Sequence, residues 1–70
     1  MRRGQLAAAI SRALDALPLE QRVAVVLCDV EGRTSAEAAQ IVGVPEGTIR
    51  TRVFHGKRKL REALTEDGLR

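Results

Sequence analysis

The feature that most constrains the fold is a pair of helix signals separated by a tight turn, within residues 34–64. Thr34 and Glu37 have the spacing of a capping box, in which each side chain satisfies a free amide of the first helical turn. Gly43 marks the end of that helix, because glycine enters the left-handed conformation without steric cost. Pro45 favours the start of a second helix, where its missing N–H would have no partner. The pattern predicts a helix-turn-helix.

The second of these helices is strongly basic. Between residues 48 and 61 it has no acid, and its cations are Arg50, Arg52, Lys57, Arg58, Lys59 and Arg61. A solvated helix face usually mixes the two signs at four-residue spacing, whereas a stripe of one sign is typical of a nucleic-acid-binding surface. We therefore expect this helix to enter a DNA major groove as the recognition helix.

Two further helices are predicted before this motif. The first is amphipathic, with an apolar stripe made of Leu6, Ile10 and Leu14. Pro18 ends it, because proline disfavours helical geometry at the preceding residue, and also starts the next helix. The predicted fold is all-α, a single domain over residues 1–70 with a C-terminal helix-turn-helix and no wing. Its helices are expected at residues 5–16, 18–30, 34–42 and 45–64.

The second helix contains a run of apolar residues, 23–28, which periodicity alone would equally assign to a buried strand. Its length and its proline start favour a helix. The core face is expected to consist of Val23, Val26, Leu27 and Val30. Val25 and Cys28 then lie on another side, which is either covered by the first helix or free to dock a protein partner.

On the last helix, the apolar stripe consists of Ile49, Val53, Leu60 and Leu64. Gly56 falls on the same stripe. Because glycine inside a helix costs about 1 kcal/mol relative to alanine, its presence here indicates close packing against another helix. Phe54, the only aromatic residue, lies off the stripe and is expected to be exposed.

Composition excludes several functional classes. Cys28 is the only cysteine, so an internal disulfide is impossible and a reducing cytoplasm is expected. His55 is the only histidine, and one cysteine with one histidine cannot supply the four ligands of structural zinc. No catalytic triad pattern or phosphate-binding loop is present, and no apolar run could span a membrane. We expect no enzyme activity, no metal, no cofactor, no small-molecule substrate and no membrane association.

A further ordered set of residues runs through the chain: Leu17-Pro18, Arg22, Glu31-Gly32, Glu37, Ala39, Gly43, Pro45, Gly47-Thr48-Ile49, Arg52 and Leu60-Arg61. At this spacing the set resembles region 4 of bacterial sigma factors, and most closely that of the extracytoplasmic-function (ECF) group. The resemblance covers roughly residues 14–64, and Pro-x-Gly-Thr-Ile-x-x-Arg is its most specific part. It implies recognition of the minus-35 element in double-stranded promoter DNA. It also implies two protein partners, the β subunit flap of the RNA polymerase core and an anti-sigma factor.

Within this resemblance, the positions that face the DNA bases are matched by Arg50, Thr51, Phe54 and His55. An arginine can donate two hydrogen bonds to a guanine, and threonine or phenylalanine can contact a thymine methyl group. Phosphate contacts, which set the register without carrying sequence information, are expected from Arg33, Arg52, Lys57, Arg58 and Arg61. The alternative for Arg52 is a structural ion pair with an acid such as Glu37.

Two other classes of function stay open at this stage. One is a regulatory module whose helices mainly bind protein, and the other is the helix-turn-helix output domain of a response regulator. The Leu17-Pro18 and Glu31-Gly32 segments favour a sigma factor over the regulator, for which a dimer on palindromic DNA would be expected. Sigma factors also need a region that melts promoter DNA. We therefore expect this chain to be an excised domain that does not initiate transcription alone.

Overall fold

The computed structural model describes residues 3–67 and contains only helices over that range. The elements are α1 (Arg3–Asp15), α2 (Leu19–Val25), η1 (Val26–Val30), α3 (Ser35–Val42) and α4 (Glu46–Asp67). The predicted all-α class is confirmed, and α2 with its π-helical continuation η1 occupies the place of the second predicted helix. Each predicted boundary lies within three residues of the observed one.

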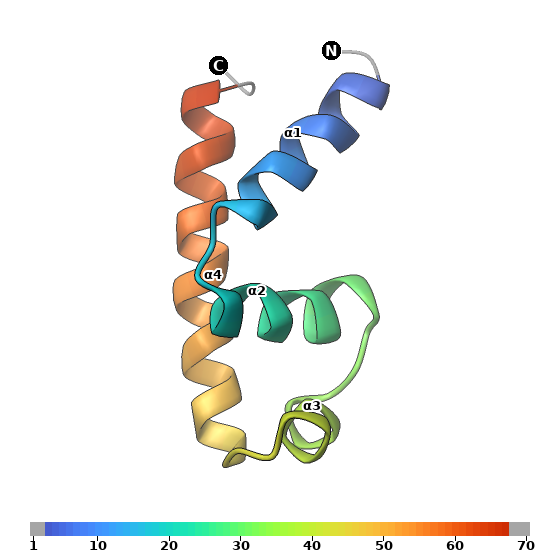
Figure 1. Ribbon diagram of the computed structural model, residues 1–70, viewed down its shortest axis with the longest axis vertical. Coiled ribbons are helices and arrows are strands. Elements are labelled where there is room, and N and C mark those ends of the chain that lie inside the picture. The colour runs from blue at the N-terminus through green and yellow to red at the C-terminus, as the bar shows by residue number, and fades with distance from the viewer. Residues whose placement is uncertain (1–2, 68–70) are drawn as a thin grey trace.

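α4 is the longest helix, and α1, α2 and α3 each pack against it (Figure 1). α3 lies beside the N-terminal end of α4, α2 crosses its middle, and α1 lies beside its C-terminal half. The molecule measures 37 × 18 × 15 Å. Because a helix rises about 1.5 Å per residue, the 22 residues of α4 extend along most of the longest dimension.

The core beneath the helix-turn-helix is made mostly of small side chains. Its buried residues are Ala24 of α2, Ala38 and Ala39 of α3, and Ile49 of α4, with larger half-buried residues packed around them. Ile49 is fully buried. Three alanines at the centre let the three helices approach closely, so the N-terminal half of α4 is held firmly against α3.

The three predicted signals of the helix-turn-helix, the capping box, Gly43 and Pro45, are all present. Thr34 Oγ1 accepts a hydrogen bond from the Glu37 amide at 3.0 Å, and Glu37 Oε1 accepts one from the Thr34 amide at 2.8 Å. The bond from the Thr34 amide to the Glu37 carboxylate, with a further contribution from the Thr34 side chain, holds the pKa of this carboxyl below its usual range. Gly43 ends α3 with a φ of 83°. α4 begins at Glu46, one residue later than predicted, so Pro45 lies immediately before the helix. The Pro45 carbonyl accepts a hydrogen bond from the Thr48 amide at 3.0 Å.

The second predicted helix departs from regular geometry in its last five residues, which form the π-helix η1. The Glu31 amide donates to the Val26 carbonyl at 2.9 Å, five residues back. This wider turn moves the side chains that follow to a different side of the helix. The predicted core face is wrong in part, because Val30 at the end of this wider turn is 66% exposed. Ala24 and Val25, which precede the π-helix in α2, are buried instead.

The prediction that Val25 contributes to a docking surface is wrong. Val25 is only 2% exposed, and α4 covers it where the alternative interpretation expected the first helix. A Cβ atom at Gly56 would lie 2.6 Å from Val25 Cγ2 and 3.4 Å from the Gln21 carbonyl oxygen. The predicted close packing at Gly56 is confirmed. Cys28, the other predicted docking residue, is half-buried.

Candidate nucleic-acid interface

A groove with a volume of about 840 Å³ lies between α4 and the segment that leads from η1 into α3. Its apolar part is formed by Cys28, Val53 and Phe54, and Thr34 and Ser35 line it at the start of α3. Its charged lining consists of five cations and two acids: Arg33, Arg50, Lys57, Arg58, Arg61, Asp29 and Glu62. We call this surface the basic groove. Its positive charge makes it suited to a polyanion.

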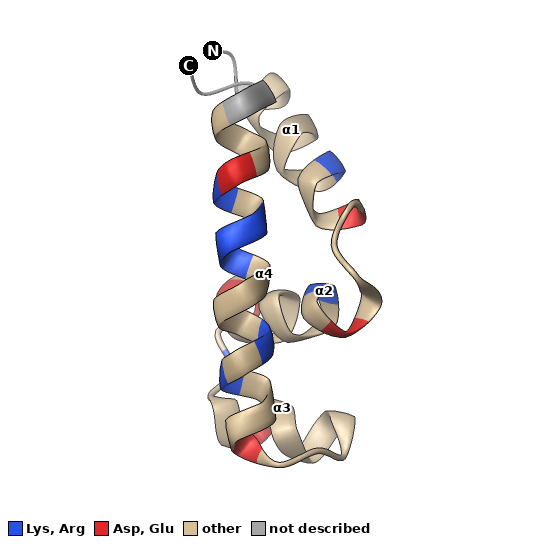
Figure 2. Ribbon diagram, turned by 90° about the vertical axis from the view of Figure 1, so that its left-hand side faces the viewer, with Lys and Arg blue, Asp and Glu red and all other residues tan. Residues whose placement is uncertain are grey.

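The sequence of α4 explains why most of these cations share one face. Residues spaced three or four apart lie above one another on a helix, and Arg50, Phe54, Lys57 and Arg61 follow that spacing. The interleaved Ile49 and Val53 face the core. Lys and Arg positions accordingly recur along α4 (blue in Figure 2). Arg33 joins them from the loop before α3, where Gly32 adopts a φ of 73°.

Four of the five cations in the basic groove lie beside an acid. Three of these pairs are local in sequence: Arg33 Nε to Glu31 Oε1 at 3.0 Å, Arg50 Nη1 to Glu46 Oε1 at 2.7 Å, and Arg58 Nε to Glu62 Oε1 at 3.4 Å. The fourth joins two elements, because Lys57 Nζ of α4 lies 3.4 Å from Asp29 Oδ2 of η1. Exposed ion pairs contribute about 0–1 kcal/mol each, so a phosphate oxygen can replace these acids at little cost.

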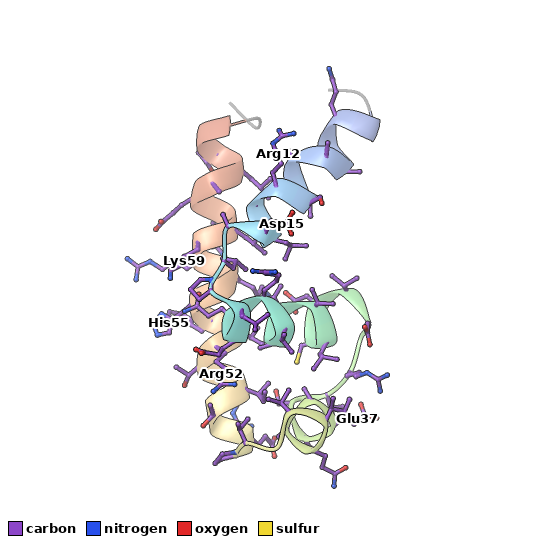
Figure 3. All side chains as sticks on the ribbon, viewed as in Figure 1. Arg12, Asp15, Glu37, Arg52, His55 and Lys59 are labelled. Atoms are coloured by element: carbon purple, nitrogen blue, oxygen red, sulfur yellow. The ribbon has the colours of Figure 1, made fainter. Side chains whose placement is uncertain are left out.

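The structure separates the four predicted base-reading residues into two groups. Arg50 and Phe54 line the basic groove, and Phe54 is 63% exposed, as predicted. Thr51 and His55 are also exposed but lie on the neighbouring face of α4, outside that lining. The His55 side chain extends from α4 on the side away from α2 (Figure 3). Its ring meets that of Phe54 edge-on, with centroids 5.3 Å apart.

Of the five predicted phosphate-binding residues, Arg52 lies apart from the others. It follows Arg50 by two residues, which is about 200° around a helix, and it is half-buried outside the basic groove. The alternative ion pair with Glu37 is not formed either. Figure 3 shows the two side chains on different parts of the molecule, and the Glu37 carboxylate bonds to the Thr34 amide.

Several groove residues were not indicated by the sequence patterns. Ser35 had an available signal, because the capping box marks a helix start, where free amides favour an anion. Asp29 had none, since its position depends on how η1 packs on α4.

Burial, with the neighbouring Asp29 charge, raises the pKa of the Cys28 thiol, so Cys28 stays protonated at neutral pH and is a poor nucleophile.

Two further kinds of feature, a metal-binding cluster and a membrane-spanning helix, are absent among the described residues. Between residues 3 and 67, no group of three or more His, Cys, Asp or Glu side chains is placed to hold a metal ion. In the same range, no helix combines the length and apolar character needed to cross a membrane.

Comparison with known families decides the relationship. The family model for region 4 of sigma-70 matches residues 7–60, which is most of the chain. The chain belongs to the sigma-70 region 4 family. This family has a helical helix-turn-helix fold that binds DNA, and it is a regulatory family and not a family of enzymes.

Individual relatives of this region 4 domain are ECF sigma factors. It is 45% identical over 62 residues to the ECF RNA polymerase sigma factor SigE of Mycolicibacterium smegmatis, covering 89% of this chain and 24% of the relative. It is 42% identical over 60 residues to SigM of Mycobacterium tuberculosis, covering 86% and 31%. EcfG of Rhodopseudomonas palustris is 43% identical over 56 residues, covering 80% and 31%. The resemblance to the ECF group is confirmed, and the chain spans about a quarter to a third of the length of these relatives.

Proposed function

We propose that this region 4 domain recognises the minus-35 element of a promoter and thereby directs RNA polymerase to initiate transcription as part of an ECF sigma factor. The observation that carries the proposal is the basic groove. It places Arg50 on the N-terminal half of α4 and Arg33 beside the start of α3, the two parts of a helix-turn-helix that approach DNA. The other three cations, Lys57, Arg58 and Arg61, extend the groove along the C-terminal half of α4. Family membership favours this function over that of a response-regulator output domain.

Two roles are proposed along α4. Arg50, Thr51, Phe54 and His55 lie in its first turns, where a helix entering the major groove meets base edges. Arg58 and Arg61 lie two to three turns further on, where only the DNA backbone is near. Together with Arg33 and Lys57 they are proposed to bind phosphates. Arg52 is the weakest member of this set, because it lies outside the basic groove.

The proposal is tested by selecting bound sequences from random duplexes and then measuring variants on the selected site and on a scrambled duplex. A sigma factor predicts an asymmetric, non-palindromic site. Replacing Arg50 with Ala is expected to cost about 1–3 kcal/mol on the selected site and far less on the scrambled one. Replacing Arg61 with Ala is expected to weaken both equally and to reduce the salt slope by about 0.9.

Lys59→Ala is the matched control, because Lys59 is exposed on the far side of α4 from α2 (Figure 3) and does not line the basic groove. It removes one positive charge from the same helix and is expected to have a smaller effect than Arg61→Ala. Equal losses on both duplexes for Arg50→Ala would mean that α4 detects charge and not sequence. Base recognition by these residues would then have to be withdrawn.

We also propose two protein partners, the β subunit flap of RNA polymerase and an anti-sigma factor. Membership of the sigma factor family supports contact with RNA polymerase. We propose that apolar side chains exposed outside the basic groove contribute to these contacts, among them Leu6 and Ile10 of α1 and Val30 at the end of η1. Cys28 is half-buried and lines the basic groove, so it is a candidate only for a partner that also covers the groove, whereas Val25 is buried. Slower hydrogen exchange in α1, α2 or η1 on adding purified polymerase core or an anti-sigma factor is the expected result. Unchanged exchange with every such partner would reject this docking surface.

A further inference from the structure

Two acids, Asp29 and Glu62, line the surface proposed to bind DNA, and Asp29 is the one that pairs with a cation of another element. Its carboxylate oxygen is 3.4 Å from Lys57 Nζ, and its side chain is 38% exposed. It lines the basic groove and also a smaller adjoining hollow of about 290 Å³, whose apolar residues are Leu60 and Leu64. A phosphate oxygen bound to Lys57 would therefore lie close to a like charge.

Asp29 differs from the other acids near the groove in how its position is fixed. Glu46 and Glu62 pair with residues four positions away on their own helix, and Glu31 pairs with a residue two positions away. Those side chains can rotate into solvent when a phosphate replaces them. Asp29 instead belongs to η1, whose turn is closed by the hydrogen bond from the Glu31 amide to the Val26 carbonyl.

The residues around Asp29 restrict it further. Leu27 and Cys28, which precede it, pack against the buried core. The Leu27 carbonyl accepts a hydrogen bond from the Arg33 amide at 3.0 Å, which fastens the loop that follows. The Asp29 backbone therefore stays beside α4 unless this packing is disturbed, and its side chain, one methylene shorter than that of a glutamate, keeps the carboxylate near the groove.

We propose that Asp29 competes with DNA phosphate for Lys57 and so lowers the affinity of this domain for any duplex. The inference rests on the proposed function and adds a residue that sets how tightly the domain binds. Because binding that does not depend on sequence comes mainly from phosphate contacts, a fixed acid at one such contact weakens binding to every DNA sequence. The domain then dissociates faster from preferred and other sites alike.

The test uses the full 70-residue chain and compares Asp29→Asn, which removes the charge at nearly constant size, with Glu20→Gln. Glu20 is an exposed acid of α2 that lines neither the groove nor the hollow, so its replacement gives the same change in net charge. Affinity is measured on the selected and scrambled duplexes across a salt series. Each variant is also made in a Lys57→Gln background.

Asp29→Asn is expected to strengthen binding to both duplexes by about two- to fivefold at low salt, because repulsion between two unit charges a few ångströms apart is relieved. The gain should exceed that of Glu20→Gln and should fall to the Glu20→Gln level in the Lys57→Gln background. A gain no larger than that of Glu20→Gln would overturn the inference. Weaker binding would also overturn it, since Asp29 would then be positioning Lys57 for DNA. If the unmodified chain binds neither duplex, the proposed function fails, and this inference with it.

Discussion

Because Gly56 has no side chain, α2 can approach α4 closely at this position. Replacing a helical glycine with alanine normally stabilises a protein. Here the new Cβ would lie 2.6 Å from Val25 Cγ2. Valine is stiff at χ1, Val25 is buried, and the Gln21 carbonyl closes the other side of the contact at 3.4 Å. Gly56→Ala is therefore expected to lower the free energy of unfolding by about 1–3 kcal/mol, as measured by urea denaturation.

Gly47 provides the matched control for this prediction, because it lies on the same helix and a Cβ there would meet nothing within 4 Å. Gly47→Ala is expected to raise the free energy of unfolding by up to about 1 kcal/mol. If both variants were stabilised to a similar extent, the contact between Val25 and Gly56 would be looser than the structure indicates.

At the scale of the helices, the capping box of α3 makes stability depend on pH. The pKa of Glu37 is lowered in the folded state by its bonds to Thr34. Its stabilising contribution is therefore complete above its ordinary pKa of 4.5 and is lost as the pH falls through the lower folded value. The difference in unfolding free energy between the unmodified chain and Glu37→Gln should be constant near neutral pH and shrink below about pH 4.5, as checked by urea denaturation from pH 7 to pH 3.

Thr34→Ala tests the same element from the other side. It removes the hydroxyl that accepts a hydrogen bond from the Glu37 amide. The free energy of unfolding is expected to fall by about 0.5–2 kcal/mol. It should also flatten the pH dependence attributed to Glu37, because part of the cause of its lowered pKa is gone. An unchanged pH profile in this variant would show that the Thr34 side chain does not contribute to the lowered pKa of Glu37 and that the Thr34 amide alone accounts for it.

The helices also differ in how well the sequence predicts them. The capping box, Gly43 and Pro45 are local signals, so the turn and the ends of α3 were predicted to within one residue. The exposure of Phe54 and the close packing at Gly56 followed from helical periodicity. The π-helix η1 did not, because a switch to bonds spanning five residues depends on what α4 and α3 offer as neighbours. That switch made Val30 exposed, and it determines where Asp29 meets the groove.

For the whole molecule, the distribution of buried area predicts that α1 is the least stable element. Among its described residues, only Ala9 and Ala13 are buried, while Leu6 and Ile10 are each 38% exposed. A helix that buries only two methyl-sized side chains opens at a smaller free-energy cost than the rest of the domain. Native-state hydrogen exchange should show lower protection for amides of α1 than for those of α2 and of α4 near Ile49. Equal protection throughout would mean that α1 unfolds only together with the core.

The arrangement around α4 has a consequence for how the protein is made. α1, α2 and α3 each find their main packing partner in α4, yet α4 is the last of the described elements in the chain. On the ribosome, the three earlier helices emerge before the surface that buries them exists, and short isolated helices are marginal in water. We therefore expect the nascent chain to stay largely unfolded until α4 has left the exit tunnel. Folding of this domain should then complete in a single step.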